Sequence, residues 1–223
     1  MKKYVLSTFT STILFAFCLS QVPVSKEPMH HNLLDNGHVR LLDVHIGPGD
    51  TTQFHIHATP SVFVILTNIK TGSQVIQEED HRKLPITHYG NIYFEGFYQL
   101  PRIHRVWNSS TSDFNVMDIE LPNKNYITID PPIQLSTGAF SFLFEEKPVR
   151  AYRLNLVPGM QISLSPRKAD ILMIQLTDSD ALVSANEKLF HKKGDFIYIP
   201  YGKPIGIKSD GKENASFAFF ELK

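Results

Sequence analysis

The sequence has very little cysteine and no excess of charge of either sign. One cysteine in 223 residues excludes a disulfide framework and a zinc site built from cysteines. With 22 basic and 22 acidic side chains, the chain lacks the basic balance of proteins that bind nucleic acids by neutralising phosphates. Hydrophobic residues make up 42% of the chain, a fraction typical of a globular protein with a buried core.

The first twenty residues form a segment of their own. Two lysines follow the initial Met, residues 4–19 carry no charge, and Ser20 is a small residue at which cleavage could occur. This pattern predicts a cleaved secretory signal peptide over residues 1–20, and so a secreted or periplasmic protein. An uncleaved membrane anchor or a lipoprotein acylated at Cys18 are the alternatives. The apolar run is short for a membrane span, however, and we expect no membrane attachment of the mature form.

The rest of the sequence has no long stretch with a 3.6-residue apolar period. It contains instead short runs rich in β-branched and aromatic residues, separated by Gly, Pro and Asp. These runs predict strands at residues 39–46, 61–66, 91–94, 113–121 and 126–129. Residues 61–66 are a short run of β-branched and aromatic residues, suited to a strand with both faces covered. Short strands at regular spacing indicate an all-β sandwich or barrel.

The two halves of the chain resemble each other. A strand-like run ends at Pro48-Gly49 in the first half and at Pro158-Gly159 in the second, and an apolar run follows about a dozen residues later in each. An offset of about 110 residues is too long for a solenoid repeat and indicates a duplicated domain. Residues 123–148 are a plausible connector, and residues 21–36 read as an N-terminal arm.

Three histidines are candidates for a metal site. His55 and His57 are two residues apart, so in a strand both side chains would lie on one face. Two imidazoles on one face suit a first-row metal ion, which needs further ligands from a neighbouring strand. His104, far along the chain, is the candidate third ligand. Alternatively, the pair lines a polar cleft without a metal. For His45 we expect a structural role, and for the remaining histidines surface or loop positions: His30, His31, His38, His81, His88 and His191.

These residues resemble the two signature motifs of the cupin superfamily. The first motif supplies Gly49, His55 and His57, but its Glu would fall at Ser61 or Val62 and is missing. From the second motif, His104 and Asn108 are kept. In the second half, Gly194, Pro200 and Gly202 fit the same motif, whereas Ile205 replaces its His and Ser209 its Asn. Ser165 and Arg167 stand at the spacing of the paired histidines.

The resemblance implies two tandem cupin (RmlC-like) jelly-roll β-barrels. The first, residues 37–122, would hold a metal, and the second, residues 149–223, would hold none. Some cupins with three histidines are non-haem iron dioxygenases, so the implied cofactor is a divalent metal, with iron the first expectation and manganese, nickel or zinc open. Candidate substrate-binding residues are Gln53, Glu95, Tyr98 and Asn108, and Glu95 is also a candidate carboxylate ligand. Arg102 and Arg105 flank His104, and either could attract a carboxylate substrate.

Two functions from different classes remain open at this point. A metal-dependent cupin oxygenase fits the three retained histidines, whereas a non-catalytic bicupin that binds a small ligand or metal fits the missing Glu. A storage-type bicupin is a third reading. In each case we expect a small-molecule ligand or a structural role, no nucleic acid, and a homodimer as the assembly to test. Fold alone does not decide among these functions.

Overall fold

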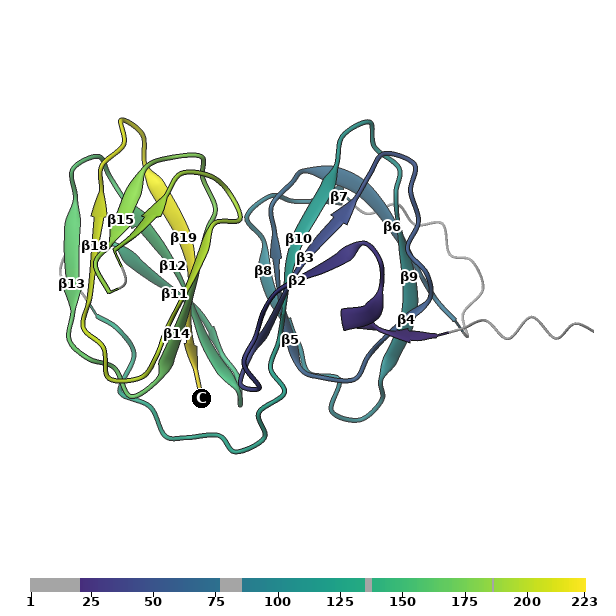
Figure 1. Ribbon diagram of the computed structural model, residues 1–223, viewed down its shortest axis with the longest axis horizontal. Helices are drawn as coiled ribbons and strands as arrows, with labels where there is room; N and C mark the ends of the chain where they lie inside the picture. Colours follow the sequence, from purple (N-terminus) through teal and green to yellow (C-terminus); the bar gives the residue numbers. More distant parts are fainter. Residues whose placement is uncertain (1–20, 77–85, 135–137, 186) are drawn as a thin grey trace, which may run out of the picture.

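The structure is a computed structural model that describes residues 21–76, 86–134, 138–185 and 187–223. It is an all-β molecule of two jelly-roll-like halves that lie side by side, as Figure 1 shows. Each half consists of two sheets, and no barrel closes completely among these residues. The fold class predicted from the sequence is therefore confirmed.

The first half contains two five-stranded sheets. One has the strand order β1-β4-β9-β6-β7 and carries the candidate site. Its strands are β1 (Val22–Pro23), β4 (His55–His57), β9 (Arg102–Asn108), β6 (Ile69–Val75) and β7 (Ile86–Thr87). The other has the order β2-β3-β10-β5-β8, with strands β2 (His30–Asp35), β3 (Arg40–Ile46), β10 (Phe114–Glu120), β5 (Ser61–Ile65) and β8 (Ile92–Glu95). A short 3-10 helix, η1 (Val24–Lys26), follows β1.

The second half repeats this arrangement. Its five-stranded sheet has the order β11 (Phe140–Glu145), β12 (Val149–Leu156), β19 (Ala215–Leu222), β14 (Asp170–Gln175) and β17 (Phe196–Ile199). Its four-stranded sheet has the order β13 (Gln161–Leu164), β18 (Ile205–Ser209), β15 (Ala181–Val183) and β16 (Lys188–Phe190). The duplication predicted from the Pro-Gly turns is visible in hydrogen bonds: Gly49 N donates to Asn108 O, and Gly159 N donates to Ser209 O.

The two halves share an apolar core between their five-stranded sheets. Strand β5 contributes Val62 and Val64 to it, and β14 contributes Leu172 and Ile174. The alternate residues of these strands face the interior of their own halves, because successive side chains of a strand point to opposite faces. Residues 62–66 are continuously apolar for this reason, and the prediction that both faces of the strand are covered is confirmed.

Three segment assignments differ from the sequence prediction. Residues 21–36, expected as an arm, contribute β1, η1 and β2 to the first half. The expected connector, residues 123–148, contains β11, which pairs with β12. The strand predicted at residues 126–129 is wrong, because these residues pair with no other strand and Ile127 is 49% exposed. The predicted signal peptide, including Cys18, lies outside the described residues.

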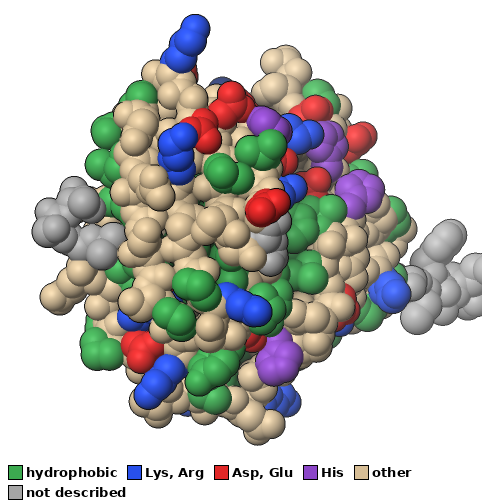
Figure 2. Space-filling view, turned by 60° about the vertical axis from the view of Figure 1, so that its left-hand side comes forward, with side chains coloured by type: hydrophobic (Ala, Val, Ile, Leu, Met, Phe, Trp, Pro, Cys, Tyr) green, Lys and Arg blue, Asp and Glu red, His purple; other side chains and the backbone are tan. Residues whose placement is uncertain are grey.

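Two further features concern membrane-spanning helices and the distribution of charge on the surface. None of the described segments forms a helix with the length and apolar character needed to cross a membrane. On the face shown in Figure 2, basic and acidic side chains are interspersed with scattered hydrophobic ones, without a broad patch of one sign. This distribution agrees with the balanced composition of the sequence.

Candidate metal site

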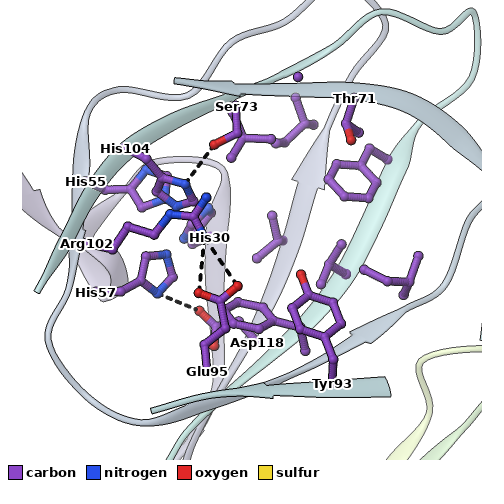
Figure 3. Close-up of a pocket in the computed structure, with 18 of the residues that line it drawn as sticks. His30, His55, His57, Thr71, Ser73, Tyr93, Glu95, Arg102, His104 and Asp118 are labelled. Atoms are coloured by element: carbon purple, nitrogen blue, oxygen red, sulfur yellow. Dashed lines mark hydrogen bonds and ion pairs between the residues drawn. The ribbon is translucent and has the colours of Figure 1, made fainter. Parts of the chain in front are cut away.

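Strands β4 and β9 bring the three predicted histidines together. His55 is paired directly with His104 across the two antiparallel strands, and His57 shares the inner face of β4 with His55. The candidate ligand atoms of the three side chains all lie within 4.8 Å of one another. The ring centroids are 4.6 Å apart for His55 and His104, 5.0 Å for His57 and His104, and 5.2 Å for His55 and His57. Figure 3 shows the cluster at one end of a cavity.

The hydrogen bonds of the rings leave one nitrogen of each available for a ligand. His55 Nδ1 donates to the carbonyl oxygen of Gln53 at 2.9 Å, so its Nε2 carries a lone pair. His104 Nδ1 lies 3.0 Å from Ser73 Oγ, and its buried Nε2 has no protein partner. His57 Nδ1 makes no hydrogen bond to the described residues and lies 3.7 Å from Asp118 Oδ2. Such contacts fix the orientation of ligating imidazoles in metalloproteins.

All three imidazoles are neutral at pH 7, as metal ligands must be. Burial lowers the pKa of His55 to about 4 and that of His57 to about 2, and it holds the pKa of His104 well below its usual value. The neighbouring histidines add to the shifts of His57 and His104, since two adjacent rings cannot both carry a proton at low cost. Nitrogens bound to one ion would lie about 3–4 Å apart, so small side-chain rotations suffice to close the site.

Asp118 is a buried carboxyl group beside this cluster. It lies on β10, is fully buried, and neither of its oxygens has a hydrogen-bond partner. Burial raises its pKa well above the usual value and the nearby Glu120 raises it further, whereas the neighbouring Ser61 hydroxyl opposes the shift. Because the pKa of His57 is lowered, Asp118 and His57 form a neutral pair rather than an ion pair. An unsatisfied buried acid is costly, and its persistence beside His57 fits a site that receives a cation.

The cavity next to the histidines has a volume of about 310 Å³ and a mainly apolar wall. That wall is formed by Val44, Ile46, Phe63, Ile65, Val106, Phe114 and Val116. At another side Arg102 Nη1 contacts both carboxylate oxygens of Glu95, at 3.2 and 3.1 Å. These two side chains are 35% and 31% exposed, so they mark the side of the cavity nearest to solvent. The space is of the size that accepts a small organic molecule.

Gln53 does not reach this cavity. It was expected on the face of His55, but its side chain is exposed and β4 begins only at His55. Thr51 pairs with Trp107 and His55 pairs with His104, so three residues lie between the two pairs on one strand and only two on the other. This extra residue interrupts the alternation on which the prediction depended.

Of the remaining substrate candidates, only Glu95 lines the cavity. Tyr98 is 53% exposed and lies near Lys147, whereas its neighbour Phe97, with a φ of +50°, stacks on His57 at 5.3 Å. Asn108 is buried, but its amide donates to the carbonyls of Ile46 and Ser112 and so holds a turn. The prediction that these two residues face the site is therefore not met, and Phe97 takes the place expected for Tyr98.

His30 is a site residue that the sequence analysis placed at the surface. That assignment is wrong, because His30 is 8% exposed, lines the cavity and packs edge-on against His55 at 4.8 Å. Burial lowers its pKa to about 3. No sequence signal indicated this position, since it depends on the pairing of β2 with β3. The other histidines expected at the surface are exposed, apart from His81, which lies outside the described residues.

The second half carries hydrophobic residues at the corresponding positions. Its β13 and β18 pair Leu164 with Ile205, as β4 and β9 pair His55 with His104. Both residues belong to the apolar core of that half. The expectation that Ser165 occupies the first ligand position is thus wrong by one residue, because β13 lacks the extra residue found before His55. Arg167 instead binds the buried carboxylate of Glu221 at 2.7 Å.

Comparisons with known proteins place the fold among the cupins. No protein-family profile and no curated protein matches the sequence. Among solved structures, salicylate 1,2-dioxygenase from Pseudaminobacter salicylatoxidans is similar, with a TM-score of 0.59 and 11% identity over 90% of this chain and 78% of that chain. A cupin 2 conserved barrel domain protein from Leptotrichia buccalis has a TM-score of 0.54 and 10% identity, covering 87% and 88%. AerE from Microcystis aeruginosa has a TM-score of 0.55 and 9% identity, covering 88% and 98%.

Proposed function

We propose that this chain with a cupin fold is an exported, metal-dependent oxygenase that acts on a small organic substrate. The observation that carries the proposal is the convergence of His55, His57 and His104, all neutral, with a buried and unpartnered Nε2 on His104. The similarity to salicylate 1,2-dioxygenase supports it at the level of fold. The export leader at residues 1–20 and a homodimeric assembly belong to the same proposal.

The three histidines would hold one divalent ion of the first transition row. Imidazole ligands suit iron, nickel and zinc, so iron is our first choice and manganese, nickel and zinc are the alternatives. Such an ion would supply Lewis acidity and, if redox-active, electrons for a reaction with dioxygen. The three ligands are neutral, and among the described residues Asp118 beside His57 is the one acid next to the cluster, so the ion keeps a net positive charge that favours an anionic or chelating substrate.

The remaining cavity residues would position that substrate. The apolar wall excludes water from the body of the molecule, and Phe97 restricts the space above His57. Arg102 has donors beyond its contact with Glu95 and could hold an oxygen atom of the substrate. Glu95 pairs with Arg102 rather than with the histidine cluster, so we assign it to substrate positioning instead of metal ligation.

Elemental analysis of the mature protein tests this proposal. We expect about one iron, or another first-row ion, per chain in wild-type protein purified under anaerobic, iron-replete conditions. The double variant His55→Ala, His57→Ala should lose the ion, whereas the exposed His191→Ala should retain it. Wild-type protein without metal under these conditions would contradict the metal site.

A second function is favoured by one specific observation. The family's carboxylate position falls at Ser61 or Val62, and neither supplies a carboxylate: Ser61 is buried and donates to the carbonyl of Thr59, and Val62 lies in the apolar core between the halves. A chain that has lost this ligand could retain metal and ligand binding without turnover. Oxygen uptake across a panel of small hydroxyaromatic acids, diketones and thiols separates the two functions. Uptake supports the oxygenase, and metal binding without uptake supports the non-catalytic module.

A further inference from the structure

The segment of residues 22–30 begins with a strand that pairs with β4, the strand that carries His55 and His57. Strand β1 runs parallel to β4, with Val22 opposite His55. Val22 N donates to Phe54 O at 3.3 Å. Strand β4 has only three residues and is paired with β9 on its other side, so this segment supplies its second neighbour. Figure 1 shows the segment in purple beside β4.

Glu27 connects this segment to His55 through the backbone of Gln53. Its carboxylate is 2% exposed and accepts hydrogen bonds from Met29 N at 2.6 Å and from Gln53 N at 3.2 Å. The carbonyl of the same Gln53 accepts from His55 Nδ1 at 2.9 Å. The Glu27 carboxylate therefore holds the residue that fixes the ring orientation of His55.

His30 supports the other side of the same ring. Its Nδ1 donates to the carbonyl of Val24 at 3.0 Å, so its position is set by η1. The ring then packs edge-on against His55, and its Nε2 lies 3.8 Å from Glu27 Oε2. Among the ring contacts of the described residues, His30 packs against His55 and not against His57 or His104, although its proximity also lowers the pKa of those two rings.

We propose that Glu27 and His30 are positioning residues that hold His55 in the orientation needed for metal binding. The inference rests on the proposed function, since it concerns the same ion. Two observations support it. The buried Glu27 carboxylate accepts a hydrogen bond from the backbone N–H of Gln53, whose carbonyl accepts from His55. The buried His30 ring packs against the His55 ring. In metalloproteins, groups that orient ligands typically contribute about 10–100-fold to metal affinity.

The experiment compares Glu27→Gln with a matched variant in the second half. In Glu27→Gln one of the two backbone N–H groups loses its acceptor, because the new amide group has a single oxygen. Glu221→Gln is the control, since Glu221 is also fully buried and accepts from Arg150, Tyr152 and Arg167. Both variants should lower the melting temperature of the metal-free protein. Zn(II) and Co(II) dissociation constants are measured by competition with a chromophoric chelator.

We expect metal binding at least about tenfold weaker in Glu27→Gln, and unchanged in Glu221→Gln. The visible absorption of bound Co(II) should also change in Glu27→Gln only, because it reports ligand geometry rather than stability. If Glu27→Gln does not fold, His30→Gln is compared with the exposed His31→Gln on the same strand, with the same expectation. If Glu27→Gln, or His30→Gln in its place, kept the wild-type affinity and spectrum, the positioning role alone would be overturned. If the wild-type protein bound neither Zn(II) nor Co(II), the metal site would be overturned as well.

Discussion

At the scale of single residues, burial of histidine couples stability to pH. Unfolded histidines take up protons below about pH 6.5. In the folded chain His55 remains neutral down to about pH 4 and His30 down to about pH 3, because burial lowers their pKa values. Over this range the unfolded state binds more protons, so the free energy of unfolding should fall as the pH falls, by at most about 1.4 kcal/mol per pH unit for each histidine.

Urea unfolding of the metal-free protein between pH 7 and pH 4 measures this slope. Asp118 contributes with the opposite sign, since its raised pKa lets the folded state keep a proton that the unfolded state loses above pH 4. A His55→Gln, His57→Gln variant keeps Asp118, so its shallower slope isolates the histidine contribution. The exposed His31→Gln should keep the wild-type slope, and a double variant with that same slope would contradict the assignment.

The sequence predicted the site residues whose positions depend on strand alternation or on the spacing of a known motif. His55 and His57 share a face because they are two residues apart, and the motif spacing identified His104. Gln53 failed for a local reason, the extra residue before His55. His30 could not be predicted, because its approach to His55 depends on pairings with β3 and β4 that are distant in sequence. Phe97 depends on a left-handed backbone that few large residues adopt.

At the scale of elements, the pairing of β6 with β9 depends on a glycine. Gly72 lies opposite Trp107, and a Cβ added to Gly72 would come within 2.1 Å of the indole ring. The residues on either side of Gly72 contribute to the cavity wall, and Ser73 holds the ring of His104. A glycine in the middle of a strand is otherwise unfavourable, so here it serves to admit the aromatic ring.

Gly72→Ala should therefore destabilise the protein by about 1–3 kcal/mol through overpacking. Trp107 is the single tryptophan of the chain, so its fluorescence reports the displaced ring directly. We expect a shifted emission maximum in the folded state together with a lower midpoint of urea unfolding. Gly37→Ala is the comparison, because its Cβ would meet no atom within 4 Å and any cost there comes from its positive φ alone. An unchanged emission maximum in Gly72→Ala would show that the strands do not meet as described.

At the scale of the whole molecule, one apolar core joins the half that carries the site to the second half. The interior of the second half is filled by a large apolar cluster, whereas the first half keeps a cavity beside a smaller cluster. The hydrophobic surface between the five-stranded sheets joins the two, with Val62 and Ile119 on one side and Leu172 and Phe220 on the other. The duplication and the continuous apolar strands were readable from sequence. Which faces of the two halves meet was not, because both halves have the same alternating pattern.

This shared core predicts that the two halves unfold as one unit, and metal provides the test. An ion that binds only the first half stabilises it by about 2.7 kcal/mol at a concentration one hundred times its dissociation constant. In a chain of this size, about 2–4 °C per kcal/mol gives an increase of about 5–10 °C in melting temperature. Calorimetry of the wild-type protein should show a single transition that moves as a whole when Zn(II) is added. Phe220→Ala, which removes a fully buried ring from the shared core, should lower the free energy of unfolding by about 3–5 kcal/mol and move the single transition to a lower temperature. Two wild-type transitions, of which Zn(II) moves only one, would mean that the shared core does not couple the site to the second half.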